Sequence, residues 1–476
     1  MTRHRCGGAV SLAAISLAAV SLAGCAIPAS RTVIEPVQSA ALGLAGAPAP
    51  LVAGDWWTGF GDPQLNRLVT DAQAGSPTLA VALTRVRQAE AILSSRRADN
   101  GPDVTLNGSL QETRLSGRYT IPPPYAGTVR TVGMATANLD WNLDLFGRQR
   151  AAIDAARASI EAARLDTEAA RLAIAGAVTQ TYIDVVRAEA QTAIAQRTIA
   201  TRQESLRLVR VQIRNKLASN LQASAAETLL AQAKTALVRA TGARVLAVNA
   251  LAALAGRGPD YAATIGRATL KLDTALVAPA SVPADLLSRR ADIAAAQARI
   301  AAAGAGRQVA RRAFYPNINL AALAGFQAIG LGNLFGLDAG TAGVGPAIRL
   351  PLFDNGRLSA DLAASTAALD LATANYNERV VGAVREVADA IALVGNLQAQ
   401  QAQNAAVVRG FAETDRLNGI RVASGLDTKL DLVDNDVRLL DAQLTQANLV
   451  ADTARQRVAL VMALGGGFTP DQEPAR

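Results

Sequence analysis

Apolar and charged positions alternate along most of the chain with the spacing of long α-helices. From Arg150 to Arg171 charged residues follow one another at steps of four and three with alternating sign, which places them on one solvated helix face. A seam of small and branched apolar residues, beginning at Ile153, keeps the same heptad step and lets neighbouring helices approach closely. Such patterns predict helices over 64–100, 147–215, 218–256, 285–313, 356–422 and 428–464. The second of these would be on the order of 100 Å long, too long for a compact domain.

Four shorter segments alternate between apolar and polar residues and predict β-strands over 104–110, 128–145, 318–328 and 344–352. In the second segment the odd positions from Val129 to Leu145 are mostly apolar, whereas the even positions include Arg130 and Asp140. One apolar and one polar face over this length is typical of a strand that crosses an outer membrane. Periodicity alone does not distinguish such strands from four strands of a soluble sheet.

Four membrane strands in one chain are too few to close a barrel, and an open sheet edge does not occur in lipid. Several copies of the chain would therefore have to share one barrel. Two copies would give 8 strands and three would give 12, and the physics of the strands does not choose between these numbers.

The chain consists of two similar halves. PDVTL at 102–106 corresponds to PNINL at 316–320, and LDLF at 143–146 corresponds to LPLF at 350–353. Each half is predicted to contain a helix, two strands and then long helices, and a repeat on this scale alters the expected fold. We divide the chain into 1–24 (signal peptide), 25–63 (acylated N-terminal extension), 64–258 (first repeat), 259–284 (linker), 285–464 (second repeat) and 465–476 (C-terminal tail).

Residues 1–24 have the features of a cleaved lipoprotein signal. A basic start precedes an apolar run at 9–22, which is shorter than the roughly 20 residues needed to span a bilayer. The LAGC sequence that ends at Cys25 resembles a lipobox, which implies lipidation of Cys25 and, because Ala follows it, sorting to the outer membrane. The alternative is an ordinary signal peptide with an incidental Cys25. Since Cys6 leaves with the leader, no disulfide is possible.

Composition excludes several classes of function. The single histidine, His4, lies in the leader, so the mature chain has no histidine for a metal site or a catalytic base. Aromatic residues make up 4% of the chain, and the net charge of +8 is spread over faces of mixed sign, which argues against nucleic acid as a partner. The Gly-x4-Gly-Lys-Ser/Thr loop of nucleotide-binding proteins is absent from the sequence. We expect a protein that is not an enzyme and that uses no cofactor or metal.

An ordered set of motifs resembles the outer membrane factors, the TolC-like exit ducts of tripartite efflux pumps. In chain order they are WWTGFGDP at 56–63, LDLFGR at 143–148, LLSRRADI at 286–293, FYP at 314–316, LPLFD at 350–354 and ALGGG at 463–467. Ala291 stands where that family usually has proline. The set fits the NodT subgroup of lipoproteins that serve resistance-nodulation-division pumps.

This resemblance implies a mainly α-helical homotrimer. Its 12-stranded outer-membrane β-barrel, with four strands from each chain, would be continued in the periplasm by a barrel of long coiled helices. The implied partners are a periplasmic membrane-fusion adaptor, an inner-membrane resistance-nodulation-division transporter and outer membrane lipid. The duct would passively conduct small molecules or drugs to the exterior, and it would be lipid-anchored in the outer membrane and extend into the periplasm.

A candidate aperture lies at the start of the last predicted helix. Asp427, Asp431 and Asp434 are spaced at i, i+4 and i+7, which predicts one acidic helix face. Acids in the first turns also complement the helix dipole, which is the alternative explanation for them. The resemblance implies that Leu430, Asp431 and Asp434 form the periplasmic gate, where three chains would place six carboxylates around a narrow mouth that favours cations.

Two further expectations remain. In the first repeat the corresponding hairpin carries Lys216 where relatives usually have glycine, so its turn geometry and its contact with an adaptor are open. The alternative to a channel is a lipid-anchored periplasmic coiled-coil scaffold without a pore, in which the strands form a soluble sheet.

Overall fold

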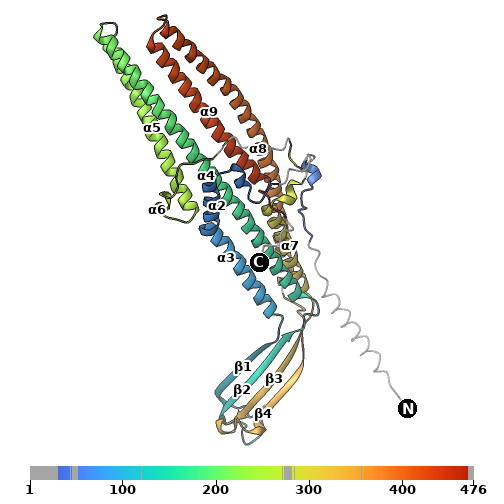
Figure 1. The fold of residues 1–476 in the computed structure, drawn as a ribbon. Helices are drawn as coiled ribbons and strands as arrows, with labels where there is room; N and C mark the ends of the chain where they lie inside the picture. The colour runs from blue at the N-terminus through green and yellow to red at the C-terminus, as the bar shows by residue number, and fades with distance from the viewer. Residues whose placement is uncertain are drawn as a thin grey trace. The chain divides into compact units, whose positions relative to one another are not determined.

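The computed structural model of the chain describes residues 31–42, 44, 52–118, 121–270, 272, 281–283, 285–354 and 356–469. The predicted signal peptide, Cys25 and most of the predicted C-terminal tail therefore lie outside the described residues. The fold is mainly helical with one sheet, as the sequence predicts (Figure 1).

Long helices make up most of the chain. They are α2 Pro63–Gly75, α3 Pro77–Ala98, α4 Arg148–Arg214, α5 Asn220–Leu254, the short α6 Pro259–Ala262, α7 Ala291–Arg312, α8 Arg357–Ala423 and α9 Lys429–Ala463. Short 3₁₀ segments are η1 Ser39–Leu42, η2 Trp56–Phe60, η3 Leu286–Arg289, η4 Leu331–Asn333 and η5 Leu337–Ala339.

The internal repeat is confirmed by the lengths of the helices. α3 and α7 have 22 residues each, α4 and α8 have 67 each, and α5 and α9 have 35 each. Two strands follow α3 and two follow α7. The contacts divide the chain differently, into one compact unit that includes Val86–Ala163 and Ala296–Tyr376 and a second that includes Val37–Arg85, Arg164–Ala295 and Asn377–Arg476. Each unit thus takes segments from both repeats, and the domain boundaries drawn from the sequence stay a prediction.

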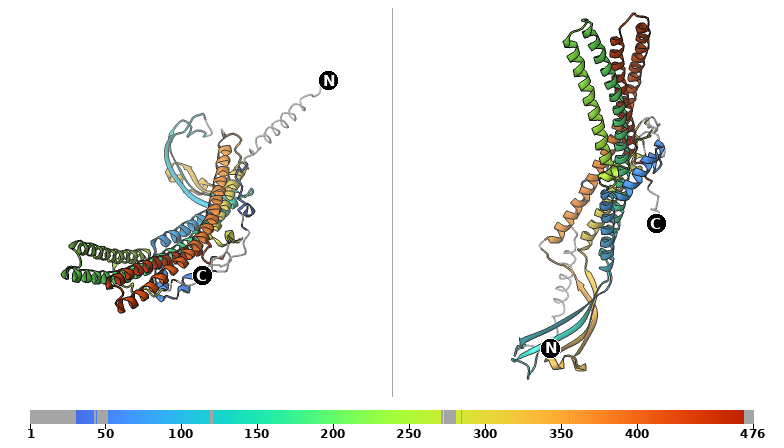
Figure 2. Two further views of the ribbon diagram at one scale, coloured as in Figure 1. Left: turned by 90° about the horizontal axis from the view of Figure 1, so that it is seen from above. Right: turned by 60° about the vertical axis from the view of Figure 1, so that its left-hand side comes forward.

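The four strands form one curved antiparallel sheet in the order β1-β2-β3-β4 (Figure 2). They are β1 Asp103–Arg114, β2 Val129–Asn142, β3 Asn317–Ile329 and β4 Gly340–Arg349. The register brings the apolar positions of all four strands to the same face, because side chains directly opposite each other point the same way. One row across the sheet is Val104, Leu139, Ala322 and Val344, and the next is Leu106, Ala137, Ala324 and Ala342.

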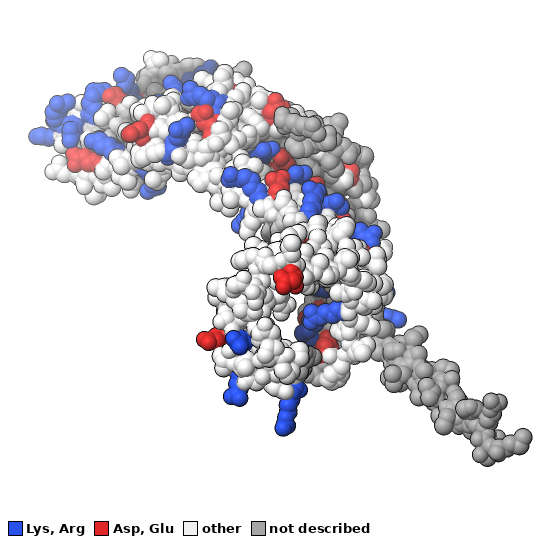
Figure 3. Space-filling view, turned by 90° about the horizontal axis from the view of Figure 1, so that it is seen from below, with Lys and Arg blue, Asp and Glu red and all other residues white. Residues whose placement is uncertain are grey.

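The described residues leave most of this apolar face uncovered, apart from one end, where Leu334 lies over Gly133 and Phe335 packs against Phe326. Leu106 is 80% exposed and Val344 is 77% exposed, which is far above what a soluble sheet tolerates for large apolar side chains. The opposite face carries Asp103, Asp140 and Asn319, and the Asn319 amide donates to the Asp140 carboxylate at 3.0 Å. Figure 3 shows few charged side chains on the sheet, in the lower part of the view, and many over the helices.

Two predicted helices differ from the structure, one by a break in its interior and one at its N-terminal end. The helix expected over 64–100 is broken at Ser76, which is extended at φ −64° and ψ 123°. Pro77 explains the break, because proline has no N–H and its ring disfavours the α conformation in the preceding residue. The helix expected from 285 begins only at Ala291, after η3 and the extended Arg290.

Both strand-to-helix junctions use an aspartate to begin a long helix. Between β2 and α4, the Asp144 carboxylate accepts hydrogen bonds from the backbone N–H of Gln149 and of Arg150, each at 2.9 Å. Between β4 and α8, Asp354 accepts from the backbone N–H of Leu358 at 3.0 Å. A carboxylate at this place satisfies N–H groups that have no partner inside the helix and complements the helix dipole.

The core of the second unit is built around a buried carboxylate. Asp62 is 1% exposed and forms the N-cap of α2, where it accepts from the Gln64 N–H at 2.8 Å. The Tyr182 hydroxyl donates to it at 2.8 Å and the Thr269 N–H at 3.0 Å. Burial opposes ionisation of Asp62, but these donors outweigh burial and hold its pKa below the ordinary value of 3.8. Ile265 and Leu270, from the predicted linker, are buried in the same core.

Removing the tyrosine donor should destabilise the protein in a pH-dependent manner. We expect Tyr182→Phe to cost about 1–3 kcal/mol at neutral pH, because it leaves a buried carboxylate short of one hydrogen bond. A depressed carboxyl pKa contributes stability that is present above the unfolded value and is lost as the pH falls through the folded one. The difference in stability between wild type and Tyr182→Phe, measured by thermal unfolding, should therefore shrink below about pH 4. Tyr376→Phe is the control, since Tyr376 is buried but its hydroxyl makes no hydrogen bond with the described residues. A deficit independent of pH would contradict this account.

The two hairpin tips have the same backbone but different residues. In the first, Lys216 N–H donates to Ile213 O at 2.9 Å and Leu217 N–H donates to Gln212 O at 2.9 Å. In the second tip the same two bonds are made by Gly425 and Leu426. Both tips are Schellman motifs, which require a left-handed residue after the helix. Lys216 has φ 60° and Gly425 has φ 72°, so the lysine occupies a glycine position.

Replacing this lysine by glycine should stabilise the first tip. Lys216→Gly relieves a left-handed conformation that costs a side-chain-bearing residue about 1–2 kcal/mol, partly offset by the greater freedom of glycine in the unfolded chain. We expect amide hydrogen exchange at residues 205–225 to slow by about two- to fivefold. Asn215→Gly is the matched control, because φ at this neighbouring residue is not positive, and it should accelerate exchange. Equal effects of the two substitutions would rule out the backbone explanation.

Candidate functional site: the acidic end of the last helical hairpin

The candidate aperture residues lie where α8 turns into α9. The α9 helix runs beside α4, and polar side chains join the two along their length. The Arg187 guanidinium lies 2.6 Å from the Asp452 carboxylate, and the Gln191 amide donates to Asn448 at 2.8 Å. These contacts fix the register of α9 against α4, and with it the height and direction of the side chains at the tip.

Asp427 does not share a helix face with the other two aspartates, and this part of the prediction is wrong. The helix begins at Lys429 with Thr428 as its N-cap, so Asp427 lies in the turn before it. Its carboxylate accepts from the Thr428 N–H at 3.0 Å and from Arg421 Nε at 3.0 Å. These two hydrogen bonds hold the pKa of Asp427 below its ordinary value. Asp427 is thus tied back to α8.

Asp431 is exposed in the first turn of α9. Its N–H donates to Thr428 Oγ1 at 3.3 Å, and the Thr428 hydroxyl donates to the Asp431 carboxylate. In the first tip Ser219 and Gln222 form the corresponding capping box. Asp431 therefore stabilises the start of the helix in addition to any role at an aperture.

Asp434 has no capping role. Its side chain is 58% exposed, and its carboxylate lies 3.8 Å from a guanidinium nitrogen of Arg202 on α4. The Arg202 side chain is only 17% exposed, so this pair joins the exposed tip of α9 to a largely buried cation on its neighbour. Asp431 and Asp434, three residues apart, lie on one side of α9.

Leu430 contacts the tip of the first hairpin. It packs with Leu206, Val209 and Ala226 in a small apolar cluster and is itself half-buried there. The structure thus brings together an apolar contact between the two tips and, beside it, two exposed carboxylates. Asn435, which the sequence did not single out, joins α9 to α8, because its side-chain amide donates to Phe411 O at 3.2 Å.

Sequence analysis did not identify the two arginines that hold the aspartates. Arg421 lies only six residues before Asp427, and the helix-turn-helix pattern could have pointed to it. Arg202 carries no signal in the sequence, because its contact depends on how α4 and α9 align. Among the described residues no group of three His, Cys, Asp or Glu side chains is placed to hold a metal ion.

The chain matches the family described as Outer membrane efflux protein over residues 68–257 and 282–466. It is 30% identical over 428 residues to the solvent efflux pump outer membrane protein SrpC of Pseudomonas putida, which covers 87% of each chain. It is 33% identical over 331 residues to the fusaric acid resistance protein FusA of Burkholderia cepacia, a match that spans 69% of this chain and 62% of that relative.

The crystal structure of the outer membrane protein VceC from Vibrio cholerae superposes with a TM-score of 0.80. The identity is 32%, over 88% of this chain and all of that one. The solved relatives are trimeric TolC-like channels, which confirms the expected fold and disagrees with the alternative of a soluble sheet on a scaffold. The chain therefore belongs to the outer membrane efflux protein family and is an efflux channel of the outer membrane that extends into the periplasm.

Proposed function

We propose that this chain is the passive outer-membrane duct of a tripartite efflux pump and that an acidic aperture closes its periplasmic end. The observation that carries the proposal is the apolar face of the sheet. The register assembles this face from residues far apart in sequence, and the described residues leave most of it uncovered. Lipid is the environment that such a face requires.

The sheet also supports the need for more than one copy. Among the described residues β1 and β4 each pair with one strand, so both edges of the sheet offer unpaired backbone groups. In a bilayer such edges must be closed, and joining the β4 of one copy to the β1 of the next closes them. Three copies supply the 12 strands of the trimeric barrel.

Two helices, α5 and α8, each have an apolar face that the described residues leave exposed. Among the described residues α5 is the one helix long and apolar enough to cross a membrane by length and composition. On it Val238 and Leu246 are each 71% exposed, and on α8 Val381 and Leu393 are about half exposed. We assign these faces to the contact between neighbouring copies, where α5 of one copy packs against α8 of the next.

The aperture is assigned to Leu430, Asp431 and Asp434. Three copies would bring six carboxylates to the periplasmic mouth, and a ring of this kind favours cations and narrows through hydrogen bonds or bound ions. The Arg202–Asp434 pair supports a closed arrangement, because it draws the tip of α9 toward α4. Opening would separate the apolar contact of Leu430 as well.

The partners follow from the pump as a whole. A duct without a nucleotide site depends on an inner-membrane transporter, which we take to be of the resistance-nodulation-division class, and on a periplasmic adaptor that joins the two. The names of relatives mention solvents and fusaric acid, and small organic molecules are the cargo we propose here. Cys25, outside the described residues, would carry the lipid that anchors the N-terminus.

Removing the two aperture charges should open the closed pore. We expect Asp431→Asn combined with Asp434→Asn to raise the resting conductance in planar bilayers severalfold and to sensitise cells to vancomycin. Asparagine retains an oxygen for the cap at 431, so the helix should still begin at the same residue. The loss of charge releases Arg202 and removes the acidic ring.

Asp441→Asn is the control for that experiment. Asp441 is exposed on α9, one heptad beyond Asp434, and its carboxylate has no partner among the described residues. Its substitution should leave the resting conductance unchanged. Wild-type conductance and wild-type vancomycin sensitivity in the double variant would refute the aperture assignment.

Replacing the predicted lipidation site should separate the anchor from the barrel. Cys25→Ser should abolish incorporation of labelled palmitate, because the acceptor thiol is gone. The protein should nevertheless remain in the membrane fraction, since a β-barrel keeps its apolar face in lipid. Continued labelling would refute the lipid anchor, and release into the soluble fraction would show that the barrel does not hold the chain in the membrane.

A further inference from the structure

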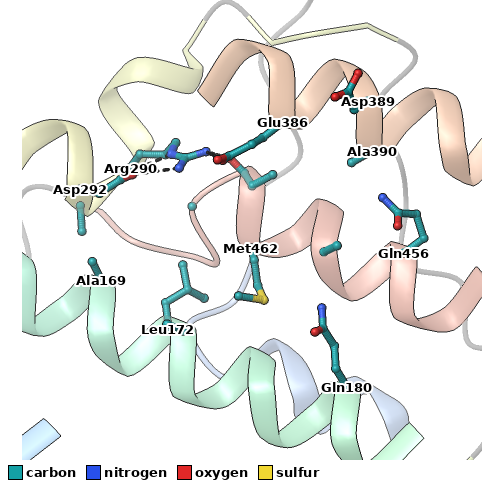
Figure 4. Close-up of a pocket in the computed structure, with 15 residues that line it drawn as sticks. Ala169, Leu172, Gln180, Arg290, Asp292, Glu386, Asp389, Ala390, Gln456 and Met462 are labelled. Carbon is teal, nitrogen blue, oxygen red and sulfur yellow. Dashed lines mark hydrogen bonds and ion pairs between the residues drawn. The ribbon is translucent and has the colours of Figure 1, made fainter. Parts of the chain in front are cut away.

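A cavity of about 480 Å³ opens in the wall of the second unit, between α4, α8, the end of α9 and the start of α7 (Figure 4). This size lies within the range of sites for small organic molecules. Two of the family motifs contribute to its walls, LLSRRADI through Arg290 and Asp292 and ALGGG through Ala463 and Gly465, but the sequence alone does not bring them together with α4 and α8.

The floor of the cavity is apolar and kept open by small residues. Leu172 and Met462 lie at its centre, and alanines of α4, α8 and α9 surround them. Gly176 permits the close approach of α9, because a Cβ atom at this position would lie 2.0 Å from the Met462 sulfur. A thioether on such a floor adapts to apolar ligands of different shapes.

The rim of the cavity is acidic. Arg290 is its single cation, and it is already paired, with Asp292 at 2.9 Å and with Glu386 at 2.8 Å. Asp389, one turn beyond Glu386 on α8, is exposed and has no hydrogen bond or ion pair with the described residues. Of the three carboxylates in the lining, Asp389 is thus the one without an ion pair to a described residue, and the amides of Gln180 and Gln456 lie nearby (Figure 4).

The cavity lies on the same side of α9 as the aperture. Ala459 and Met462, which line it, follow Asp431 and Asp434 by 28 residues each, or four heptads. In helices that coil around one another, residues a whole number of heptads apart keep the same face. If the aspartates face the lumen, so does the cavity.

The other two helices agree with this direction. On α8, Asn377 accepts from the backbone N–H of Val37 at 2.7 Å, and Glu386 lies nine residues further on, on the opposite side of the helix. On α4, Gln180 and Ala173 lie opposite Tyr182, which binds the N-terminal Asp62. The cavity thus opens away from the N-terminal segment, as a lumenal site requires when a lipid anchor holds that segment outside the tube.

We propose that this cavity binds amphiphilic organic cations in the lumen above the aperture. The apolar part of the ligand would lie on Leu172 and Met462, and its charge would stay at the mouth beside Asp389 and Glu386. A divalent metal ion requires more oxygen ligands than this rim supplies, and an anion would meet an excess of carboxylates. The inference rests on the proposed channel, since it needs the cavity to face the transport path. Three copies would place three such sites around the lumen.

Binding of ethidium to the trimer tests the inference. Titration of the intact trimer in phosphatidylcholine nanodiscs, followed by ethidium fluorescence and corrected with empty nanodiscs, should saturate. Asp389→Asn should weaken the affinity by about fivefold, the upper range for a pair of exposed charges. Ala173→Phe, at an exposed position of the lining, should abolish binding by filling the cavity while every charge remains. Fluorescein, an anion of similar size, should show no saturable binding.

Asp441→Asn provides the matched control. It removes the same charge from the aperture side of α9 outside the cavity, and it should leave ethidium affinity unchanged. Equal weakening by both aspartate variants would indicate diffuse attraction by the lumen and overturn the site. Absence of binding to the wild-type trimer would overturn it as well. Failure here, together with increased conductance of the aperture variant, would leave the channel proposal standing, so the two proposals fail separately.

Discussion

The rest of the structure depends on one requirement, that backbone hydrogen bonds be satisfied where no water can reach them. Four strands in register give an apolar face suited to lipid and leave two edges that lipid cannot accept. The chain cannot meet this requirement alone. Sharing a barrel meets it and also imposes threefold symmetry on the helices, and in the assembly proposed above the uncovered faces of α5 and α8 would acquire partners from neighbouring copies.

Long, regular elements are what the sequence predicts well. The charge spacing after Arg150 predicts α4 to within one residue at each end, because a continuous helix repeats its pattern many times. Strand faces follow from alternation, and the register then aligns them. The errors occur where a single residue outweighs a pattern, as Pro77 does, or where a helix begins, as at Lys429. The Arg202–Asp434 contact and the cavity lined by Leu172 and Met462 could not be predicted from the sequence, because both depend on how separate helices align.

Asp431 illustrates how one residue serves stability and function together. As a capping residue it helps to begin α9, and as an exposed carboxylate it is available to a ring at the mouth. Asp434 caps no helix, so it is available only as an exposed carboxylate at the mouth, where Arg202 is its partner. The alternative raised by the sequence, that acids here complement a helix dipole, therefore applies to Asp431 more than to Asp434. The two positions differ in what their loss would cost the fold.

The two hairpin tips differ in the residue at the left-handed position, lysine in one and glycine in the other, and a partner that surrounds the assembled tube would meet both. Three chains present six tips of the same backbone, which alternate between a strained lysine turn and a relaxed glycine turn next to carboxylates. Turns of one backbone conformation thus carry two kinds of side chain. A partner that encircles these tips must either share the threefold symmetry or make two different kinds of contact in turn around the ring.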